Sequence, residues 1–323
     1  MSSFSSLVSL SSLPVYVSLI EATSLHKSFG RTHAVNGVSL NVQAGEAYGL
    51  VGPDGAGKTT TLRLLVGALH ADSGAVRVGG YDVARQTDLA RAGLGYLAQR
   101  FSLYGDLTVV ENLRFFGQVR GVSRSALEQH AAEMLRFVGL GGFEDRRADQ
   151  LSGGMKQKLG LACALVHQPK VLLLDEPTSG VDPVTRQDFW QLIIRLLAEG
   201  AAVIVSTPYM DEAARCNRIG FMYSGRLLIE GAPRVLTASM NGRVLELAAH
   251  PKDKARFVAQ NDPDVEDVLT FGDRFHLRVK ETAGPLERLP TLLAMAAVKV
   301  DRLRPIAPSL EDVFIALLNK TRP

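Results

Sequence analysis

Gly52-Pro53-Asp54-Gly55-Ala56-Gly57-Lys58-Thr59-Thr60 is the stretch that decides the fold of this chain. It follows a predicted buried strand over 46–51 and opens a predicted helix that runs to about residue 68. Glycines in the loop allow backbone N–H groups to face an anion, and the helix directs its positive end at the same point. Lys58 adds a charge for the β- and γ-phosphates, and the Thr59 hydroxyl is a ligand for Mg²⁺. The pattern predicts a loop that holds the phosphates of a nucleotide.

A second chemical feature is Val171-Leu-Leu-Leu-Asp175-Glu176-Pro177, an apolar strand that ends in two carboxylates. Ligands of α/β sheets bind at the carboxyl ends of the strands, which is where these carboxylates would lie. We expect Asp175 to hold Mg²⁺ through water and Glu176 to polarise the water that attacks the γ-phosphate. An apolar run before Asp-Glu is a weak signal alone, but beside the phosphate loop it indicates ATP hydrolysis.

A third feature is Leu151-Ser152-Gly153-Gly154, which opens a predicted helix that reaches about residue 167. The Ser152 hydroxyl, the free N–H groups and the helix dipole together favour an anion. One ATP does not need two such loops from one chain, so we expect this loop to cap the γ-phosphate bound to another subunit. The alternative is an ordinary glycine turn before a helix.

Buried strands alternate with helices over most of the chain, which is typical of an α/β fold with a parallel sheet. We predict a P-loop nucleotide-binding domain over 15–238, with a helical subdomain at about 100–165, after a loose tail over 1–14. The pattern over 239–323 is strand, helix, hairpin, helix, strand and helix, without a catalytic cluster. It predicts a small α+β accessory domain.

Composition excludes several classes of protein. The 323 residues are 46% hydrophobic and 21% charged, which is ordinary globular composition, and the net charge of +3 does not favour nucleic-acid binding. The two cysteines, Cys163 and Cys216, exclude a disulfide scaffold and are expected to be buried core residues. The first basic residue is Lys27, which does not fit a signal peptide, and no later apolar run approaches a membrane span. We expect membrane contact only through a partner.

These motifs, in this order, resemble the nucleotide-binding subunits of ABC transporters over roughly residues 18–235. Within that resemblance, 52–59 corresponds to the Walker A loop, 171–175 to Walker B with Glu176 as general base, and 151–155 to the signature motif, with Met155 where Gln is commonest. The resemblance further implies that Gln99 senses Mg²⁺ and contacts the membrane subunit. It implies that Phe29 stacks on adenine, with a core phenylalanine as the alternative. Ser179-Gly180-Val181-Asp182 resembles the D-loop at the dimer interface.

Details of the motifs narrow the resemblance to the drug-export branch that pairs with ABC-2-type permeases, in particular to the N-terminal ATP-binding half of tandem multidrug exporters. The run Pro308-Ser-Leu-Glu-Asp-Val-Phe314 belongs to this likeness. The resemblance implies ATP and Mg²⁺ as cofactors, an ABC-2-type permease as partner, and a peripheral position on the cytoplasmic face of the bacterial inner membrane.

One position departs from the family. Members carry a switch histidine in a run like Ser-Thr-His-Tyr-Met-Asp-Glu-Ala, whereas this chain has Pro208 at that place in Ser206-Thr-Pro-Tyr-Met-Asp-Glu-Ala213. Proline has neither a side-chain donor nor an N–H, so it cannot contact the γ-phosphate or orient the attacking water. We expect slow hydrolysis at this chain's own site and infer a heterodimer with a second ATP-binding subunit, with a homodimer or a chance mutation as alternatives.

Two other functions compete with the exporter subunit. A non-transport ABC ATPase of DNA repair or ribosomes is disfavoured, because only 117 positions separate Lys58 from Asp175 and the chain has neither a second cassette nor a basic linker. A regulatory module that binds ATP with little turnover stays open because of Pro208.

Overall fold

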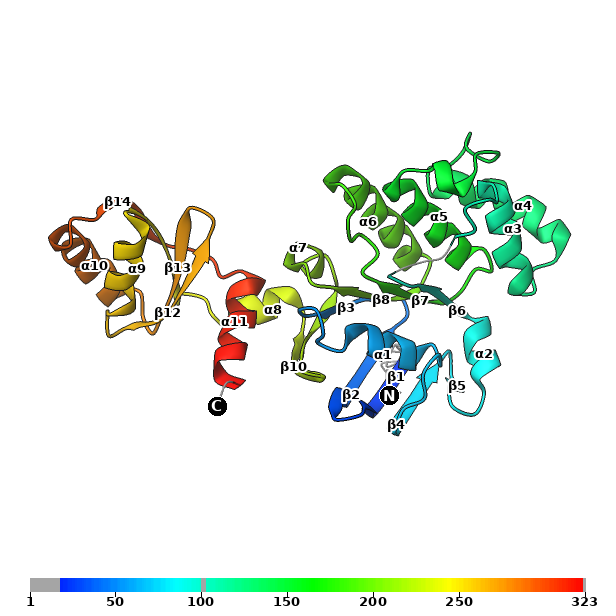
Figure 1. Cartoon of the computed structure of the whole chain (residues 1–323). Coiled ribbons are helices and arrows are strands. Elements are labelled where there is room, and N and C mark those ends of the chain that lie inside the picture. Colours follow the sequence, from blue (N-terminus) through cyan, green and yellow to red (C-terminus); the bar gives the residue numbers. More distant parts are fainter. Residues whose placement is uncertain (1–17, 100–102, 322–323) are drawn as a thin grey trace, which may run out of the picture. The chain divides into compact units, whose positions relative to one another are not determined.

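The computed structural model describes residues 18–99 and 103–321, so the predicted tail over 1–14 lies outside the described residues. The chain forms two compact units (Figure 1). The first runs to Pro208 and includes Met222–Leu227, and the second holds Tyr209–Phe221 and the residues from Leu228 on. The predicted domain boundary at 238/239 stays a prediction.

A parallel sheet forms the centre of the first unit. Strand β3 (Ala47–Val51) pairs with β8 (Ala202–Thr207), which pairs with β7 (Val171–Asp175), which pairs with β6 (Leu94–Leu97). Every residue of β3, β7 and β8 is buried, because both faces of the sheet are covered, as their continuous apolar sequences predict. The parts of β9 (Arg218–Tyr223) and β10 (Arg226–Gly231) that fall in this unit extend the sheet past β3.

A second, antiparallel sheet in the first unit has the order β2-β1-β4-β5. Its strands are β1 (Ser18–Phe29), β2 (Thr32–Gln43), β4 (Ser73–Val78) and β5 (Tyr81–Asp82). Its inward side chains join those of β3 and of helix α1 (Lys58–Leu65) in one apolar core. Helix α1 ends earlier than predicted, because Gly67 takes a left-handed φ of 69° just after it.

The remaining helices of the first unit flank the parallel sheet. In Figure 1, α3 to α6 lie on one side of the parallel sheet and α1 on the other. Thr108 and Glu111 form a capping box at the start of α3, in which each side chain bonds the other's backbone N–H. The helices are α2 (Thr87–Ala92), α3 (Val109–Val119), α4 (Arg124–Phe137), the short 3₁₀ helix η1 (Ala148–Gln150), α5 (Gly153–Leu165) and α6 (Pro183–Ala198).

The second unit is an α+β structure with the strand order β12-β13-β11-β14. Its β-α-β-β-α-β sequence is that of a ferredoxin-like fold, and the inner face of the sheet packs on α9 and α10 around Leu247, Phe275 and Leu289. Its elements are α7 (Met210–Ala213), α8 (Pro233–Ala238), β11 (Val244–His250), α9 (Lys252–Gln260), β12 (Val265–Phe271), β13 (Arg274–Val279), α10 (Ala283–Met295), β14 (Lys299–Pro305) and α11 (Leu310–Thr321).

Residues 308–314, which contribute to the family resemblance, form the start of α11 and the segment before it. Ser309 and Asp312 bond each other's backbone and side chain, and Asp312 also faces His276 with 3.0 Å between Oδ1 and Nδ1. Phe314 packs on Phe221 with 5.1 Å between ring centroids. These residues therefore have a structural role within the second unit.

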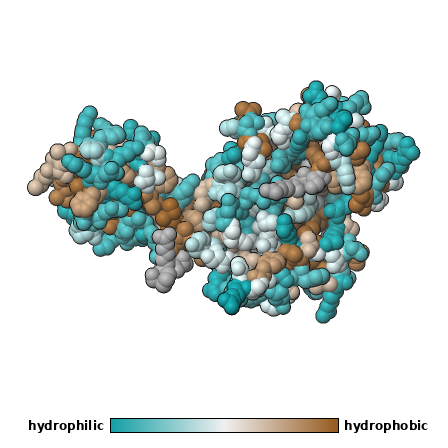
Figure 2. Space-filling view, viewed as in Figure 1, coloured by the Kyte–Doolittle hydropathy of each residue, from teal (hydrophilic) through white to brown (hydrophobic). Residues whose placement is uncertain are grey.

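The surface visible in Figure 2 is largely hydrophilic, and the two cysteines are buried. Hydrophilic residues cover most of the face seen in Figure 2, with small apolar patches between them. Cys163 and Cys216 are buried, as predicted, and burial raises the pKa of both thiols. Within 18–99 and 103–321, no helix has the length and apolar character to cross a membrane.

Candidate nucleotide-binding site

The loop between β3 and α1 has the shape that the sequence predicts for a phosphate-binding loop. Gly57 caps α1 with φ 107°, a left-handed conformation that favours glycine. A Cβ at Gly57 would lie 2.2 Å from the Ala34 carbonyl oxygen, and one at Gly52 would lie 2.2 Å from the Met222 carbonyl oxygen. A Cβ at Gly55, at the tip, would meet nothing within 4 Å. Glycine is thus required at both ends of the loop for steric reasons.

Lys58 is held inside the protein by three contacts. Its ammonium donates to the carbonyls of Gly52 at 2.9 Å and Pro53 at 3.1 Å, and it forms an ion pair with Glu176 Oε1 at 3.1 Å. The Lys58 and Glu176 side chains are only 4% and 8% exposed. Gln99 donates to the other Glu176 oxygen at 3.0 Å. These contacts match the three N–H donors of the lysine, so a phosphate that takes Lys58 must replace some of them.

Asp175 lies at the centre of the site and is 1% exposed. Its Oδ1 accepts from Thr59 Oγ1 at 3.0 Å and from Ser206 Oγ at 2.7 Å, while Oδ2 accepts from Tyr96 at 3.4 Å. Burial and the nearby Asp175 charge raise the pKa of Tyr96 to about 12, so this hydroxyl stays protonated and keeps donating.

The Thr59 and Asp175 oxygens suit Mg²⁺, because this ion prefers hard oxygen ligands and takes one or two from the protein besides phosphate oxygens and water. The described residues contain no group of three or more His, Cys, Asp or Glu side chains that could hold a metal without such help. The donor set therefore fits an ion bound together with a nucleotide.

The other residues of the predicted loop flank these groups. Asp54 is exposed at the loop tip, Ala56 is buried beneath it, and Thr60 lies in the first turn of α1. Phe29 ends β1 with half of its surface exposed, and Lys27 Nζ lies 5.7 Å from its ring centroid. An exposed aromatic ring of this kind is free to stack on a base, and the alternative of a core phenylalanine does not fit its exposure.

The signature loop, 151–155, lies at the start of α5. Ser152 is exposed and caps α5 by accepting from Met155 N at 3.3 Å. Gly153 is also exposed, Leu151 is buried, and a Cβ at Gly154 would lie 2.8 Å from Thr185 Cγ2. The Ser152 hydroxyl and the start of α5 are exposed, and their role toward a nucleotide on another chain stays a prediction.

The position at which the resemblance implies a switch histidine lies next to the phosphate loop. Thr207 is the Cα partner of Val51, and its carbonyl accepts from Gly52 N at 3.3 Å. Pro208 is the next residue and is half-buried. The structure thus places a proline, with no donor, where the resemblance implies a histidine.

Two residues of the site, Tyr96 and Ser206, were not predicted to act there. Both lie near the carboxyl ends of parallel strands, where a site is expected. The sequence signal was available: Tyr96 precedes Gln99 by three positions and Ser206 precedes Pro208 by two. Which of the strand residues point at Asp175 became visible only from the pairing of the strands.

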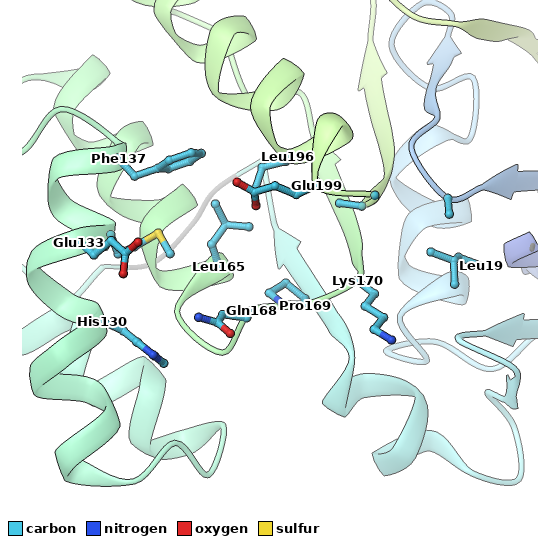
Figure 3. A pocket seen from close by; sticks show the side chains of 14 residues that line it. Leu19, His130, Glu133, Phe137, Leu165, Gln168, Pro169, Lys170, Leu196 and Glu199 are labelled. Carbon is cyan, nitrogen blue, oxygen red and sulfur yellow. The ribbon is translucent and has the colours of Figure 1, made fainter.

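A separate cavity of about 650 Å³ lies at the opposite, amino-terminal edge of the parallel sheet. Figure 3 shows its walls, built by Phe137, Leu165, Pro169 and Leu196, with Lys170 at the start of β7. It contains none of the residues of the phosphate loop and is not the nucleotide site.

The parallel sheet, the glycine loop at a helix start and the two carboxylates on the neighbouring strand define a P-loop nucleotide-binding ATPase domain. Comparison with known proteins narrows this class. The family described as "ABC transporter" matches residues 35–179. The chain belongs to the ATP-binding proteins of the ABC transporter family, in a group whose relatives are multidrug, Nod factor and drug-resistance proteins.

Particular relatives show the extent of the similarity. The "Probable multidrug ABC transporter ATP-binding protein YbhF" of Escherichia coli (strain K12) is 43% identical over 88% of this chain, which spans about half (49%) of that relative's length. The "Linearmycin resistance ATP-binding protein LnrL" of Bacillus subtilis (strain 168) is 33% identical over 94% of this chain and 99% of its own. The solved "Dimeric structure of a post-hydrolysis state of the ATP-binding cassette MJ0796 bound to ADP and Pi" has a TM-score of 0.61 and 27% identity over 66% of this chain and 98% of its own.

Proposed function

We propose that this chain is the ATP-hydrolysing subunit of an exporter and works with an ABC-2-type membrane permease. The observation that supports this most is the meeting of Lys58, Thr59, Asp175 and Glu176 at one edge of the parallel sheet. The printed names of the relatives, which include multidrug and Nod factor export proteins, support export as the direction of transport. In this proposal the chain lies peripherally on the cytoplasmic face of the bacterial inner membrane, whichever cargo is carried. The chain has two domains, over 15–238 and 239–323.

The chemistry follows from a change of partners at Lys58. In the free chain Glu176 is neutralised by Lys58 and held by Gln99. When the triphosphate binds, Lys58 turns its charge to the β- and γ-phosphates, and Glu176 becomes free to accept a proton from the attacking water. Bound Mg²⁺ supplies charge neutralisation at the phosphates, and Thr59 and Asp175 are the residues that would hold it. The reaction needs no covalent intermediate on the protein.

Hydrolysis at this site is slow in the proposal, because Pro208 supplies no donor to the γ-phosphate. By comparison with the removal of one preorganised donor, the loss is roughly 10²–10³ in rate. A second ATP-binding chain would then carry the faster site, and Ser152, Gly153 and Gly154 of this chain would cap it. A solved relative, the MJ0796 cassette, is described as dimeric, which supports assembly in pairs.

The permease would dock near the aromatic cluster of Tyr104, Phe115 and Phe116, close in sequence to Gln99. The Tyr104 and Phe115 ring centroids are 4.7 Å apart and those of Phe115 and Phe116 are 5.4 Å apart. Tyr104 is 49% exposed although it is a large aromatic residue. Exposed aromatic residues of this kind are enriched at protein interfaces.

Co-purification with an ABC-2-type permease tests the docking surface. Tyr104→Ala and Phe115→Ala are expected to reduce recovery of the complex, whereas Phe257→Ala, which removes an exposed ring in the second unit, serves as the control. Equal loss with all three variants, or no loss with any, would contradict the proposed surface.

A regulatory subunit that binds ATP without turnover is the second candidate, and Pro208 is the observation that favours it. ATP turnover of the complex with the permease distinguishes the two candidate functions. ATP turnover that falls with Glu176→Gln supports a working site, while turnover that is indifferent to Glu176 supports the regulatory role.

A further inference from the structure

Strand β8 places one hydroxyl between the two acidic residues of the site. Ser206 is fully buried at the carboxyl end of β8. It is the Cα partner of Asp175 in the last register pair between β7 and β8. The side chain of Ser206 therefore lies next to the point where the chain leaves β7 and enters Glu176.

This hydroxyl bonds both acidic residues at once. Ser206 Oγ donates to Asp175 Oδ1 at 2.7 Å and accepts from the backbone N–H of Glu176 at 3.1 Å. A serine hydroxyl has a single O–H donor, so donation to Asp175 uses its one hydrogen and fixes its orientation. The Ser206 backbone carbonyl also accepts from Glu176 N at 3.1 Å, so this one residue satisfies the Glu176 amide from two atoms.

Glu176 needs such support because its backbone is strained. Its φ is 48°, in the left-handed region that residues with a Cβ seldom adopt. Strained conformations persist where the surrounding structure holds them in place, and they gather at functional sites. The bonds from Glu176 N to Ser206 are contacts that hold the amide of this turn.

We propose that Ser206 is a positioning residue of the ATP site: it orients the Asp175 carboxylate toward the metal and holds the Glu176 turn that aims the general base. This inference rests on the proposed ATP-hydrolysing function. The role matters most when nucleotide is bound, because Thr59 would then serve Mg²⁺ as a ligand as well as contact Asp175. Ser206 and Tyr96 are the other hydroxyl donors to Asp175, and Tyr96 bonds at the longer distance of 3.4 Å.

The test compares Ser206→Ala with Ser206→Thr, which restores the hydroxyl on a side chain suited to a strand. Thr87→Val is the matched control, because it removes a hydroxyl in the same unit that bonds only the Val83 carbonyl among the described residues. Binding of a fluorescent ATP analogue is measured with EDTA and over a Mg²⁺ titration, together with steady-state turnover and thermal unfolding of the full chain.

Ser206→Ala is expected to bind ATP in EDTA within about twofold of the natural chain, since Lys58 and the loop are intact. It is expected to need roughly 10-fold more Mg²⁺ for half-maximal effect, as befits a lost hydrogen bond to a charged group. When Ser206→Ala is added to the faster Pro208→His variant, kcat should fall roughly 10-fold with little change in KM. Ser206→Thr should recover most of both losses. Thr87→Val should leave the Mg²⁺ dependence unchanged.

An unchanged Mg²⁺ midpoint in Ser206→Ala, with an unchanged kcat when it is added to Pro208→His, would overturn the inference. Equal losses of ATP affinity with and without Mg²⁺, which indicate a merely structural role, would overturn it too. Failure of the proposed function would give a different set of results. A chain that binds Mg²⁺-ATP but shows no turnover even as Pro208→His contradicts hydrolysis, while the Mg²⁺ midpoint still decides the role of Ser206. A natural chain that binds no ATP overturns both.

Discussion

The ion pair between Lys58 and Glu176 predicts that neutralising the base will tighten nucleotide binding. The two charges are 3.1 Å apart and almost fully buried. At an effective dielectric constant of about 20, the attraction between such charges is on the order of 5 kcal/mol. The loss of hydration of both groups offsets much of this value. A net of about 1–2 kcal/mol is left to oppose the transfer of Lys58 to a phosphate, and repulsion between Glu176 and the phosphates acts in the same direction.

Glu176→Gln is therefore expected to lower the Kd for ADP and for a non-hydrolysable ATP analogue by roughly 5- to 30-fold, a factor that corresponds to about 1–2 kcal/mol. Glutamine keeps the size of the side chain and still accepts from Lys58, so the loop should keep its shape. Calorimetric titration in EDTA at low protein concentration gives the affinity without contributions from metal, hydrolysis or dimerisation.

Gln99→Ala is the control for this experiment, because it removes a neutral partner of Glu176 and leaves the charges unchanged. It should change the Kd by less than about threefold in the same titration, because the charges of Lys58 and Glu176 that oppose phosphate binding are both still present. A Kd for Glu176→Gln equal to or weaker than that of the natural chain would refute the reasoning, because Lys58 would then not be restrained by Glu176 before nucleotide binds.

Three further predictions concern the loop, the base-stacking residue and the second unit. Gly57→Ala should destabilise the chain and abolish ATP binding, because its Cβ would meet Ala34 O at 2.2 Å, whereas Gly55→Ala should cost only about 1 kcal/mol in thermal unfolding. Phe29→Ala should weaken ATP binding by about 1–3 kcal/mol, the usual range for base stacking, and leave tripolyphosphate binding unchanged in competition titrations. Glu246 is held by Arg274, Arg302 and Arg304, chiefly by its hydrogen bond to Arg274, which lowers its pKa from 4.5 to about 2. The stability from this depressed pKa is present above about pH 4.5 and lost as the pH falls through about 2, so the deficit of Glu246→Gln in urea unfolding should shrink on acidification.

The sequence predicts the site well where a function needs a fixed spacing. The glycines and Lys58 must follow one another in order, because a single loop wraps the phosphates, and the structure has that loop between β3 and α1. The capping box of Thr108 and Glu111 is equally local, because its two residues are three positions apart. Such features depend on neighbours along the chain and can be read without knowledge of the fold.

Contacts between strands could not be predicted in this way. Ser206 and Tyr96 reach Asp175 from β8 and from the end of β6, through pairing across the sheet. The sequence places all of them at strand ends but does not give the register that turns their hydroxyls toward one carboxylate. The ion pair between Lys58 and Glu176 in the free chain could not be predicted either, because the motifs assign each residue only a role toward ATP. The run 308–314 contributes to the family resemblance, and the structure shows what its residues do: Ser309 bonds Asp312, and Phe314 packs on Phe221.

The central claim is that Pro208 slows this chain's own ATP site while Glu176 remains competent. The most direct measurement is steady-state ATP turnover of the purified natural chain, of Pro208→His, and of the double variant Pro208→His with Glu176→Gln. We predict turnover near background for the natural chain, an increase of roughly 10²–10³ with Pro208→His, and loss of that increase in the double variant. Turnover of the natural chain at an ordinary enzymatic rate of about 1 s⁻¹ or more, dependent on Glu176 and unaffected by Pro208→His, would contradict the account and favour a homodimer with two working sites.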